Sequence, residues 1–236
     1  MEGIEWSKKA VKGGDVAQLT SRFSELLEQR GVLLHFKRGD LIYGLNDPND
    51  MIYWIKKGRV KLSYLDETGR KLTLDIFGQS QLFGELSLTP LDKRELLAEA
   101  LETTEVVAAD RNRLLDQAKR DPRLMLEILT LIGKRSRNVQ HKLEDMAFKD
   151  LPTRLARILL HLADKHGHPT SQGTQIDCRL THQDLADLIG ATRTNVTMML
   201  SAFYSKGLLK KGRYITITNE KQLREKGYGH REKQLN

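Results

Sequence analysis

Hydrophobic positions change their spacing about halfway along the chain, which predicts two kinds of architecture. From residue 32 to about 109, short apolar stretches alternate with turns that contain glycine, asparagine or proline. Strands of this length and spacing are typical of an antiparallel roll or barrel. The clearest hairpin joins VKLSYL to RKLTLDIF around residues 66–69. From about residue 112 the apolar period becomes helical, so the predicted fold class is α+β.

Residues 122–148 predict one long helix, because they contain a single glycine and no proline after the first position. Within this helix, side chains at alternating steps of three and four predict a coiled-coil seam for dimerisation. The predicted seam residues are Met125, Ile128, Ile132, Arg135, Val139, Lys142 and Met146. Two of them are charged, which weakens the seam interpretation. A helix buried against its own domain is the alternative.

Shorter elements complete the outline. Residues 15–31 have apolar side chains at helical spacing and predict a short amphipathic helix. A second helix follows the long one at PTRLARILLHLADKH, where Pro152 is tolerated in the first turn. We expect GHPTSQGT to be a loop. From residue 219 the chain is charged and nearly free of apolar residues, which predicts a mobile tail or a frayed helix.

The segment LTHQDLADLIGATRTNVTMMLSAFYS, residues 180–205, predicts two helices joined by a tight turn. Thr181 and Asp184 have the spacing of a capping box, Gly190 ends the first helix, and Thr192 caps the second. Helices joined so closely must cross steeply, and the small Ala186 lies where a helix-turn-helix needs close packing. After them, LLKKGRYITIT predicts a basic hairpin with its turn at 211–212.

The outward side of the second helix offers contacts to DNA. Arginine can form two hydrogen bonds with guanine, asparagine can pair with adenine, and threonine can reach phosphate or a thymine methyl group. The basic hairpin forms a wing that can lie along the phosphate backbone. The predicted DNA contacts are Thr181, His182, Gln183, Thr192, Arg193, Thr194, Asn195, Thr197, Met198, Ser201, Lys210, Lys211 and Arg213. An ordinary helical pair with a solvated face is the alternative.

Charge and cysteine content narrow the function classes. The 236 residues have a formal net charge of +8, and residues 151–236 hold +7 of it. A basic domain beside a nearly neutral one favours a polyanionic partner, nucleic acid ahead of an anionic membrane, with a solvated basic surface as the alternative. The single cysteine, Cys178, excludes an intrachain disulfide and a cysteine-ligated zinc or iron–sulfur site. The chain starts without an apolar signal segment and has no membrane-spanning run, so we expect a cytoplasmic protein.

A β-roll, a long seam helix and a C-terminal winged helix-turn-helix, in this order, resemble the CRP/FNR family of bacterial transcription regulators. The resemblance covers about residues 15–218 and is carried by FGEL, MAFKDLPTRLARILLHLA and LTHQDLADLIGATRTNV. It implies a homodimer with two recognition helices in successive major grooves of a roughly palindromic site, and contact with RNA polymerase. The predicted domains are the β-roll with its short N-terminal helix at 1–111, the dimerisation helix at 112–149, the winged helix-turn-helix at 150–218 and the tail at 219–236.

In the cyclic-AMP receptors of this family, a glycine, a glutamate, an arginine and a serine surround the cyclic phosphate. Gly84, Glu85 and Arg94 match the first three, but Glu95 stands at the serine position. Two anions ~4 Å apart repel by roughly 4 kcal/mol at an effective dielectric of 20. The positions of the family's two adenine-binding hydroxyl groups fall on Val139 and Gln140, which have no hydroxyl group.

We therefore expect that cyclic AMP is not the effector and that the chain needs no cofactor or metal. A salt bridge between Arg94 and Glu95 without any ligand, and a different anionic effector, are the open alternatives. Haem would need an axial ligand, for which His35 and His141 are the nearest candidates. An enzyme with a two-histidine metal site in the roll is excluded, because His35 is the only histidine there. A regulatory subunit without DNA contact remains a rival.

The predicted recognition helix departs from that of the cyclic-AMP receptor. Arg193 matches the family pattern, but Thr194 stands at a glutamate position and Met198 at an arginine position. The side chains that read base edges determine the preferred sequence. We therefore expect a different operator sequence.

Overall fold

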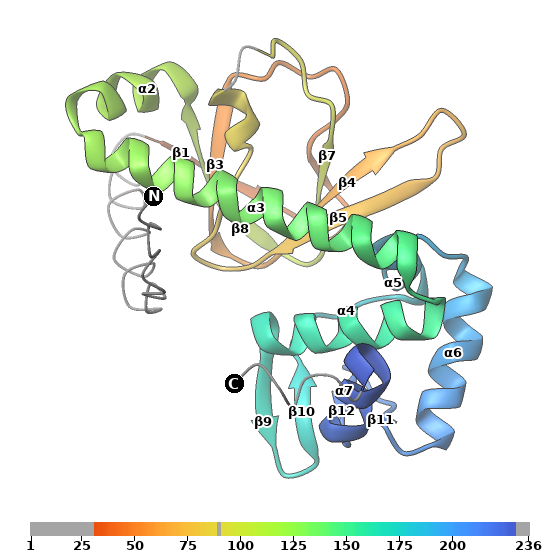
Figure 1. Ribbon diagram of the computed structural model, residues 1–236. Helices are drawn as coiled ribbons and strands as arrows, with labels where there is room; N and C mark the ends of the chain where they lie inside the picture. Colours follow the sequence, from red (N-terminus) through yellow and green to blue (C-terminus); the bar gives the residue numbers. More distant parts are fainter. Residues whose placement is uncertain (1–30, 89–90, 230–236) are drawn as a thin grey trace, which may run out of the picture.

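The computed structural model describes residues 31–88 and 91–229, and begins with two four-stranded antiparallel sheets that form the predicted roll (Figure 1). The first sheet has the order β1 (Val32–Phe36), β8 (Thr104–Asp110), β3 (Met51–Lys57) and β6 (Leu82–Phe83). The second has the order β2 (Leu41–Tyr43), β7 (Leu97–Ala100), β4 (Val60–Leu65) and β5 (Lys71–Phe77). The short 3-10 helix η1 (Glu85–Leu88) follows β6.

Aromatic rings fill the space between the two sheets. Phe83 is fully buried, and its ring stacks on Tyr53 with the centroids 5.0 Å apart. Phe77 of β5 also stacks on the Phe83 ring, with the centroids 6.2 Å apart. The predicted β4–β5 hairpin is confirmed. Its turn is held by Asp66, whose carboxylate accepts hydrogen bonds from the backbone N–H groups of residues 68 and 70.

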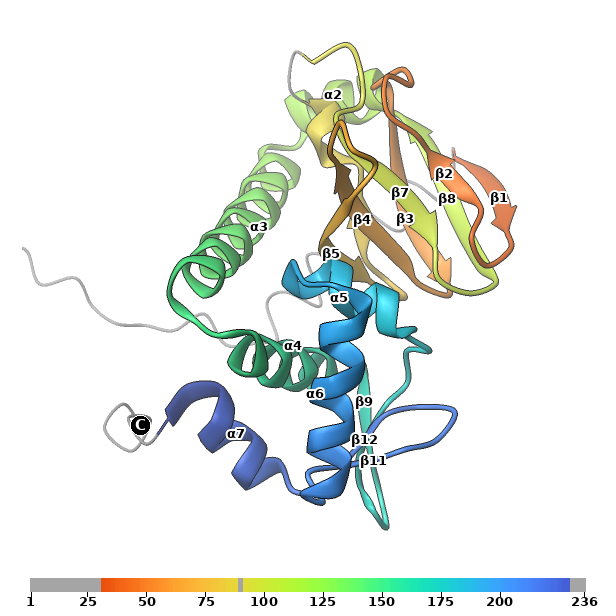
Figure 2. The same ribbon diagram turned by 90° about the vertical axis from the view of Figure 1, so that its right-hand side faces the viewer.

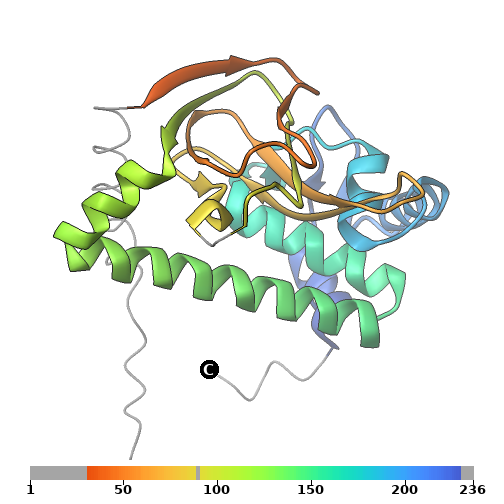
Figure 3. The same ribbon diagram turned by 90° about the horizontal axis from the view of Figure 1, so that it is seen from above.

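Two helices connect the roll to the rest of the chain. The helix α2 (Arg111–Arg120) ends before Asp121, whose side chain caps α3 (Pro122–Phe148) by accepting a hydrogen bond from the backbone N–H of Arg123. The bounds of α3 agree with the predicted long helix, but the predicted continuous helix from residue 112 is wrong because the chain bends at this cap. Seen from above, α3 runs along the whole length of the roll (Figure 3).

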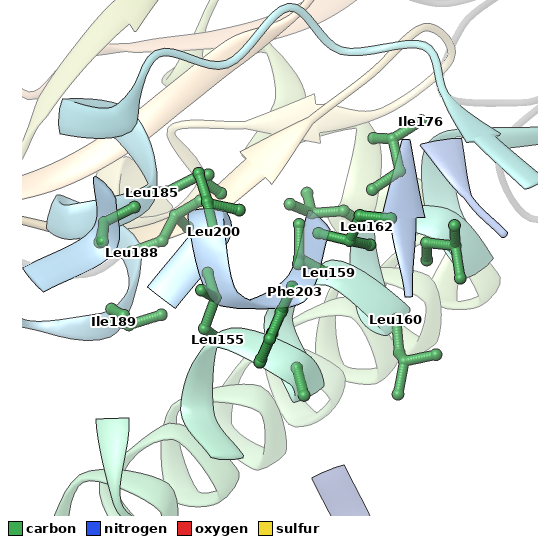
Figure 4. Packing of buried hydrophobic residues seen from close by; sticks show 14 of the residues in the cluster. Leu155, Leu159, Leu160, Leu162, Ile176, Leu185, Leu188, Ile189, Leu200 and Phe203 are labelled. Carbon is green, nitrogen blue, oxygen red and sulfur yellow. The ribbon is translucent and has the colours of Figure 1, made fainter. Parts of the chain in front are cut away.

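The C-terminal domain contains four helices and a four-stranded sheet. The helices are α4 (Leu151–His166), α5 (His182–Ile189), α6 (Arg193–Ser205) and α7 (Glu220–Tyr228). The sheet has the order β11 (Leu209–Lys210), β12 (Thr216–Ile217), β10 (Gly173–Ile176) and β9 (Gly167–Thr170). Leu155 and Leu159 of α4, Leu185 of α5 and Leu200 of α6 meet in its core (Figure 4).

Two predictions for this domain are wrong. The expected loop GHPTSQGT is the β9–β10 hairpin, since the backbone groups of 167–170 pair with those of 173–176. The tail, expected to be mobile or a frayed helix, contains the ordered helix α7, which packs on α4 with Leu223 fully buried and the centre of the Tyr228 ring 4.6 Å from the Arg157 guanidinium. One leucine and one tyrosine are enough to anchor an otherwise polar helix. The predicted helix at 15–31 falls almost wholly outside the described residues.

The two domains share a buried contact. Ile76 and Leu101 of the roll belong to the same buried cluster as the core of the C-terminal domain. Lys61 of β4 forms two ion pairs in the same region. Its Nζ lies 2.9 Å from Oδ1 of Asp184 in α5 and 3.0 Å from Oε1 of Glu99 in β7. Figure 2 shows α5 against the end of the roll near β5. The roll therefore holds the first helix of the helix-turn-helix directly.

Candidate functional site

The α5–α6 pair has the local geometry of the predicted helix-turn-helix. Thr181 and Asp184 form the capping box, because the Thr181 hydroxyl accepts from the Asp184 N–H and the Asp184 carboxylate accepts from the Thr181 N–H. Gly190 ends α5 with φ of 64°, a left-handed conformation that favours glycine. The Thr192 hydroxyl then caps α6 by accepting from the Asn195 N–H at 3.2 Å.

The outer face of α6 is polar and open to solvent. Val196, Leu200 and Phe203 are buried on the inner side. The predicted contact residues Arg193, Thr194, Thr197, Met198 and Ser201 are exposed, and Asn195 is half-buried. This face keeps several donors and acceptors available, which is what contact with base edges requires.

The start of α5 lies beside this face. His182 Nδ1 is 2.8 Å from the Thr197 hydroxyl, so the two helices are linked across their polar side. The exposed Gln183 donates a hydrogen bond to Asp187 at 2.7 Å. Thr181 and Thr192 are exposed at the two helix starts. The His182–Thr197 contact therefore brings the start of α5 next to the polar face of α6.

The wing is confirmed as a short hairpin, with Leu209 paired to Ile217 and Lys210 to Thr216. Its connection spans residues 211–215 and is longer than the predicted turn at 211–212. Lys210, Lys211 and Arg213 are exposed on it. Lys210 donates a hydrogen bond to the Gln172 side chain at 2.8 Å, which joins the wing to the β9–β10 hairpin. Sequence reasoning missed Gln172, because a segment interpreted as a loop has no predicted position relative to the wing.

In the roll, Arg94 is engaged by neutral groups. It is 5% exposed and donates hydrogen bonds to the backbone carbonyls of Met51 and Gly84. Its guanidinium lies 4.2 Å from the centre of the Tyr43 ring, a cation–π distance. Of the two open alternatives, the Arg94–Glu95 salt bridge is not supported, because in the described part of the chain no ion pair joins these two residues.

The carboxylate of Glu85 is paired with an arginine from outside the roll. Arg135 of α3 forms an ion pair with Glu85 and donates a hydrogen bond to the Leu82 carbonyl. Its guanidinium lies 4.6 Å from the Phe77 ring centre. Burial lowers the pKa of Arg135 to about 10, still far above neutrality. Arg135 is thus a cationic partner that sequence reasoning missed, because its position on the helix was assigned to a dimer seam.

The space beside Gly84, Glu85, Arg94 and Glu95, which we call the phosphate loop, is small. A cavity of about 20 Å³ is lined by Tyr43, Gly84, Glu85, Arg94 and Glu95, among others. Such a volume admits roughly one water molecule, whereas small-molecule sites occupy about 300–1,000 Å³. Val139 and Gln140 do not line this cavity but are exposed on α3. The six effector candidates are therefore not assembled into one ligand-sized site.

Three of the residues predicted for the seam on α3 contact the roll. Ile128 is 3% exposed and packs against the roll, Arg135 enters it, and Lys142 donates a hydrogen bond to the Thr73 carbonyl. These three side chains face their own chain. The exposed large apolar side chains of α3 are Met125, Leu126, Leu129, Val139, Leu143 and Phe148. Of the other predicted seam residues, Met125 and Val139 are exposed, and Ile132 and Met146 are half-buried. Leu129 and Leu143, which follow Ile128 and Lys142 in the sequence, are exposed.

The described residues form neither a metal cluster nor a membrane-spanning helix. Within residues 31–88 and 91–229, no group of three or more His, Cys, Asp or Glu side chains could hold a metal ion. None of the helices described there is both long and apolar enough to cross a membrane.

Known proteins resemble both domains. Sequence models of the cyclic nucleotide-binding domain and of the Crp-like helix-turn-helix domain match residues 33–121 and 153–226. A CRP-like cAMP-activated global transcriptional regulator of Mycobacterium tuberculosis is 30% identical over 80% of this chain and 84% of its own. The global nitrogen regulator of Synechocystis sp. is 32% identical over 79% of this chain and 81% of its own. The structure of a c-di-GMP-responsive global regulator of Xanthomonas campestris is 25% identical, with a TM-score of 0.72, over 86% of this chain and 99% of its own.

Proposed function

The chain belongs to the CRP/FNR family of transcription regulators and has a helix-turn-helix DNA-binding domain, and on this premise we propose that it binds a roughly palindromic operator as a homodimer without a cyclic nucleotide. The exposed polar face of α6 beside a basic wing carries the proposal. The family consists of regulators rather than enzymes, and RNA polymerase is its proposed partner in transcription.

Base reading is assigned to Arg193 and backbone contact to Lys211. A bidentate arginine contact is worth about 1–3 kcal/mol of discrimination, whereas a phosphate contact contributes equally on every sequence. In a binding-site selection, Arg193→Ala should relax one base position. Lys211→Ala should keep the selected sequence and reduce the slope of log affinity against log salt by about 2, because the homodimer loses one phosphate contact from each subunit.

Lys119→Ala is the matched control. Lys119 is an exposed lysine of α2, outside the C-terminal domain, and it pairs with Asp116 of the same helix. It should leave both affinity and salt slope unchanged. Retention of full operator binding by both Arg193→Ala and Lys211→Ala would contradict the assigned interface. It would favour a regulatory subunit that does not contact DNA. Half-sites identical to the cyclic-AMP receptor consensus would contradict the expected change of operator.

The homodimer is supported by a mostly apolar face on α3, which Ser136 interrupts. Met125, Leu129, Ile132, Ser136, Val139 and Leu143 follow each other at steps of four and three. This spacing is that of a two-stranded coiled coil. Leu129 is 57% exposed and Leu143 is 62% exposed. The face therefore has apolar surface at two places along α3 that a second copy of the chain could bury.

Light scattering on a sizing column tests the seam. Leu129→Asp should convert the dimer into a monomer and weaken operator binding, because it places two carboxylates opposite each other across the two-fold axis. Leu41→Asp, at a 54% exposed leucine of the roll, should remain dimeric. A Leu129→Asp protein that stays dimeric would overturn the proposed seam.

Independence from cyclic AMP is supported by the state of the phosphate loop. Glu85 and Arg94 already have buried partners, and a phosphate would have to displace the Arg94 contacts beside the Glu95 carboxylate. We expect operator affinity to be the same with and without 1 mM cyclic AMP on protein stripped of small molecules. A tenfold change in that titration would refute this part of the proposal.

A further inference from the structure

A cavity of about 300 Å³, fifteen times the volume of the one in the roll, lies between the two domains. Its walls come from β5 of the roll, from α3, and from α4, α5 and α7 of the C-terminal domain. We call it the interdomain cavity. Leu74, Ile158 and Leu188 give it apolar surface, whereas Lys142, Arg154 and Arg157 bring cationic groups. Its volume is at the lower end of the range for small-molecule sites.

The cationic groups of the interdomain cavity are not equally compensated. Arg157 has an ion pair with Asp145, and the other lining aspartate, Asp75, lies 3.1 Å from Lys165. Lys142 donates to the Thr73 carbonyl, and Arg154 donates to the carbonyls of residues 149 and 189. Between residues 31 and 229, the described side chains include no carboxylate in an ion pair with Lys142 or Arg154. The hydrogen-bond acceptors of these two half-buried cations are therefore neutral, although Asp75 and Asp145 act on Lys142 from a longer distance.

We propose that the interdomain cavity binds a small amphipathic carboxylic acid. Its carboxylate lies between Lys142 and Arg154, where a charge-assisted hydrogen bond replaces an interaction with a neutral carbonyl. Its apolar body lies against Leu74, Ile158 and Leu188. A neutral ligand would leave both cations without a charged hydrogen-bond partner, and an organic cation next to them would meet repulsion, so these two groups favour the anionic class.

The cavity face of α3 differs from the proposed dimer seam. Asn138, Lys142 and Asp145 line the cavity, whereas Leu129 and Leu143 are on the exposed side of the helix. At 100° per residue, residues 138 and 145 lie about 160–180° from the direction of Leu129 and Leu143. The cavity therefore stays accessible in the proposed dimer.

A ligand in this position contacts both domains at once. Leu74 belongs to the roll, and Leu188 belongs to the first helix of the helix-turn-helix. Such a ligand stabilises the arrangement in which both walls are present and so shifts the population of domain orientations. Control of DNA binding by this ligand rests on the proposed function, but occupancy of the cavity does not.

Fluorescence of 8-anilinonaphthalene-1-sulfonate, an aromatic anion that brightens in apolar sites, provides the binding assay on the full chain without DNA. We expect saturable binding with one probe per chain. Octanoate should displace the probe, and octanol, which has the same apolar length without the charge, should be at least tenfold weaker. This comparison uses the unsubstituted protein, so it does not depend on the folding of a variant.

Lys142→Met removes the cation and keeps an unbranched side chain of similar length. Octanoate affinity should fall about tenfold or more in this variant, and Lys134→Met, at a half-buried lysine of the same helix outside the cavity, should leave it unchanged. Equal displacement by octanol and octanoate, no saturable binding, or unchanged octanoate affinity in Lys142→Met would each overturn the proposal. Because no DNA is present, these results are independent of whether the chain binds an operator.

Discussion

The ion pair between Lys61 and Asp184 ties the roll to the helix-turn-helix, and its removal should destabilise the protein measurably. Lys61 Nζ lies 2.9 Å from Asp184 Oδ1 and 3.0 Å from Glu99 Oε1. The side chains of Lys61 and Asp184 are 7% and 8% exposed. Lys61→Met keeps an unbranched side chain but leaves the Asp184 carboxylate buried with fewer partners.

The size of the effect follows from these distances. Two unit charges 2.9 Å apart attract by roughly 6 kcal/mol at an effective dielectric of 20, before the cost of desolvation. Removal of one partner from a buried pair costs about 3–5 kcal/mol. Asp184 would keep the hydrogen bonds from Thr181 and the Arg38 guanidinium at 3.6 Å. We therefore expect Lys61→Met to lower the free energy of unfolding by about 3 kcal/mol, the lower end of that range.

The pKa directions agree that pairing outweighs burial. Burial alone would lower the pKa of Lys61, but hydrogen bonds and charges from Asp184 and Glu99 raise it overall. Burial would raise the pKa of Asp184, but hydrogen bonds from Thr181 and Lys61 lower it below 3.8. The contribution of the pair should thus be present between about pH 4 and pH 10. It is lost as the pH falls through the folded pKa of Asp184, or rises through that of Lys61.

Urea unfolding of Lys61→Met, Asp184→Asn and the double variant measures the coupling. We expect a coupling energy of about 1–3 kcal/mol at pH 7, because the two side chains share one contact. Below pH 4 the difference between the unsubstituted protein and Lys61→Met should shrink. Lys71→Met, which loses a partly exposed bond to Glu99 and no contact with Asp184, should cost less than about 1 kcal/mol. Purely additive costs of Lys61→Met and Asp184→Asn would refute the coupling.

Three further measurements test the packing. Leu223→Ala should lower the free energy of unfolding by about 2–5 kcal/mol in urea, because a fully buried leucine anchors α7; a cost below about 1 kcal/mol would mean that α7 does not pack as described. Gly173→Ala should lower the thermal midpoint of unfolding by several degrees, because φ is +126° and a Cβ atom would collide with the Ile217 carbonyl. Gly39→Ala is the control: Gly39 also has a positive φ, but the space around it is open, so the effect should be smaller. The Cys178 thiol is 3% exposed and burial raises its pKa to about 12, so Ellman's reagent should react only after unfolding; rapid reaction of the native protein would contradict this.

Local signals account for the elements that were predicted well. β1 coincides with the apolar run VLLHF, and α3 begins at Pro122 and ends at Phe148 as its period suggests. The capping box at Thr181 and the left-handed turn at Gly190 depend on neighbouring residues only. By contrast, β6 has two residues and pairs with the distant β3, so no periodicity within it could predict it. α7 was interpreted as a tail because Leu223 is one of its few apolar residues, and only its contact with α4 reveals that it is buried.

The candidate site divides in the same way. The polar face of α6 and the basic wing were identified from the sequence, because a helix of known period and a short hairpin determine which side chains share a surface. The direction of Arg135 was decided only by tertiary structure. A seam position and a core-facing position on α3 differ by one residue, about 100° of rotation, and the local pattern supports both. The buried Glu85 carboxylate resolves this choice, since it lies where α3 crosses the roll and Arg135 is its partner. The sequence therefore predicted which residues form the surface proposed to contact DNA, and the packing of α3 against the roll decided that Arg135 is the partner of Glu85.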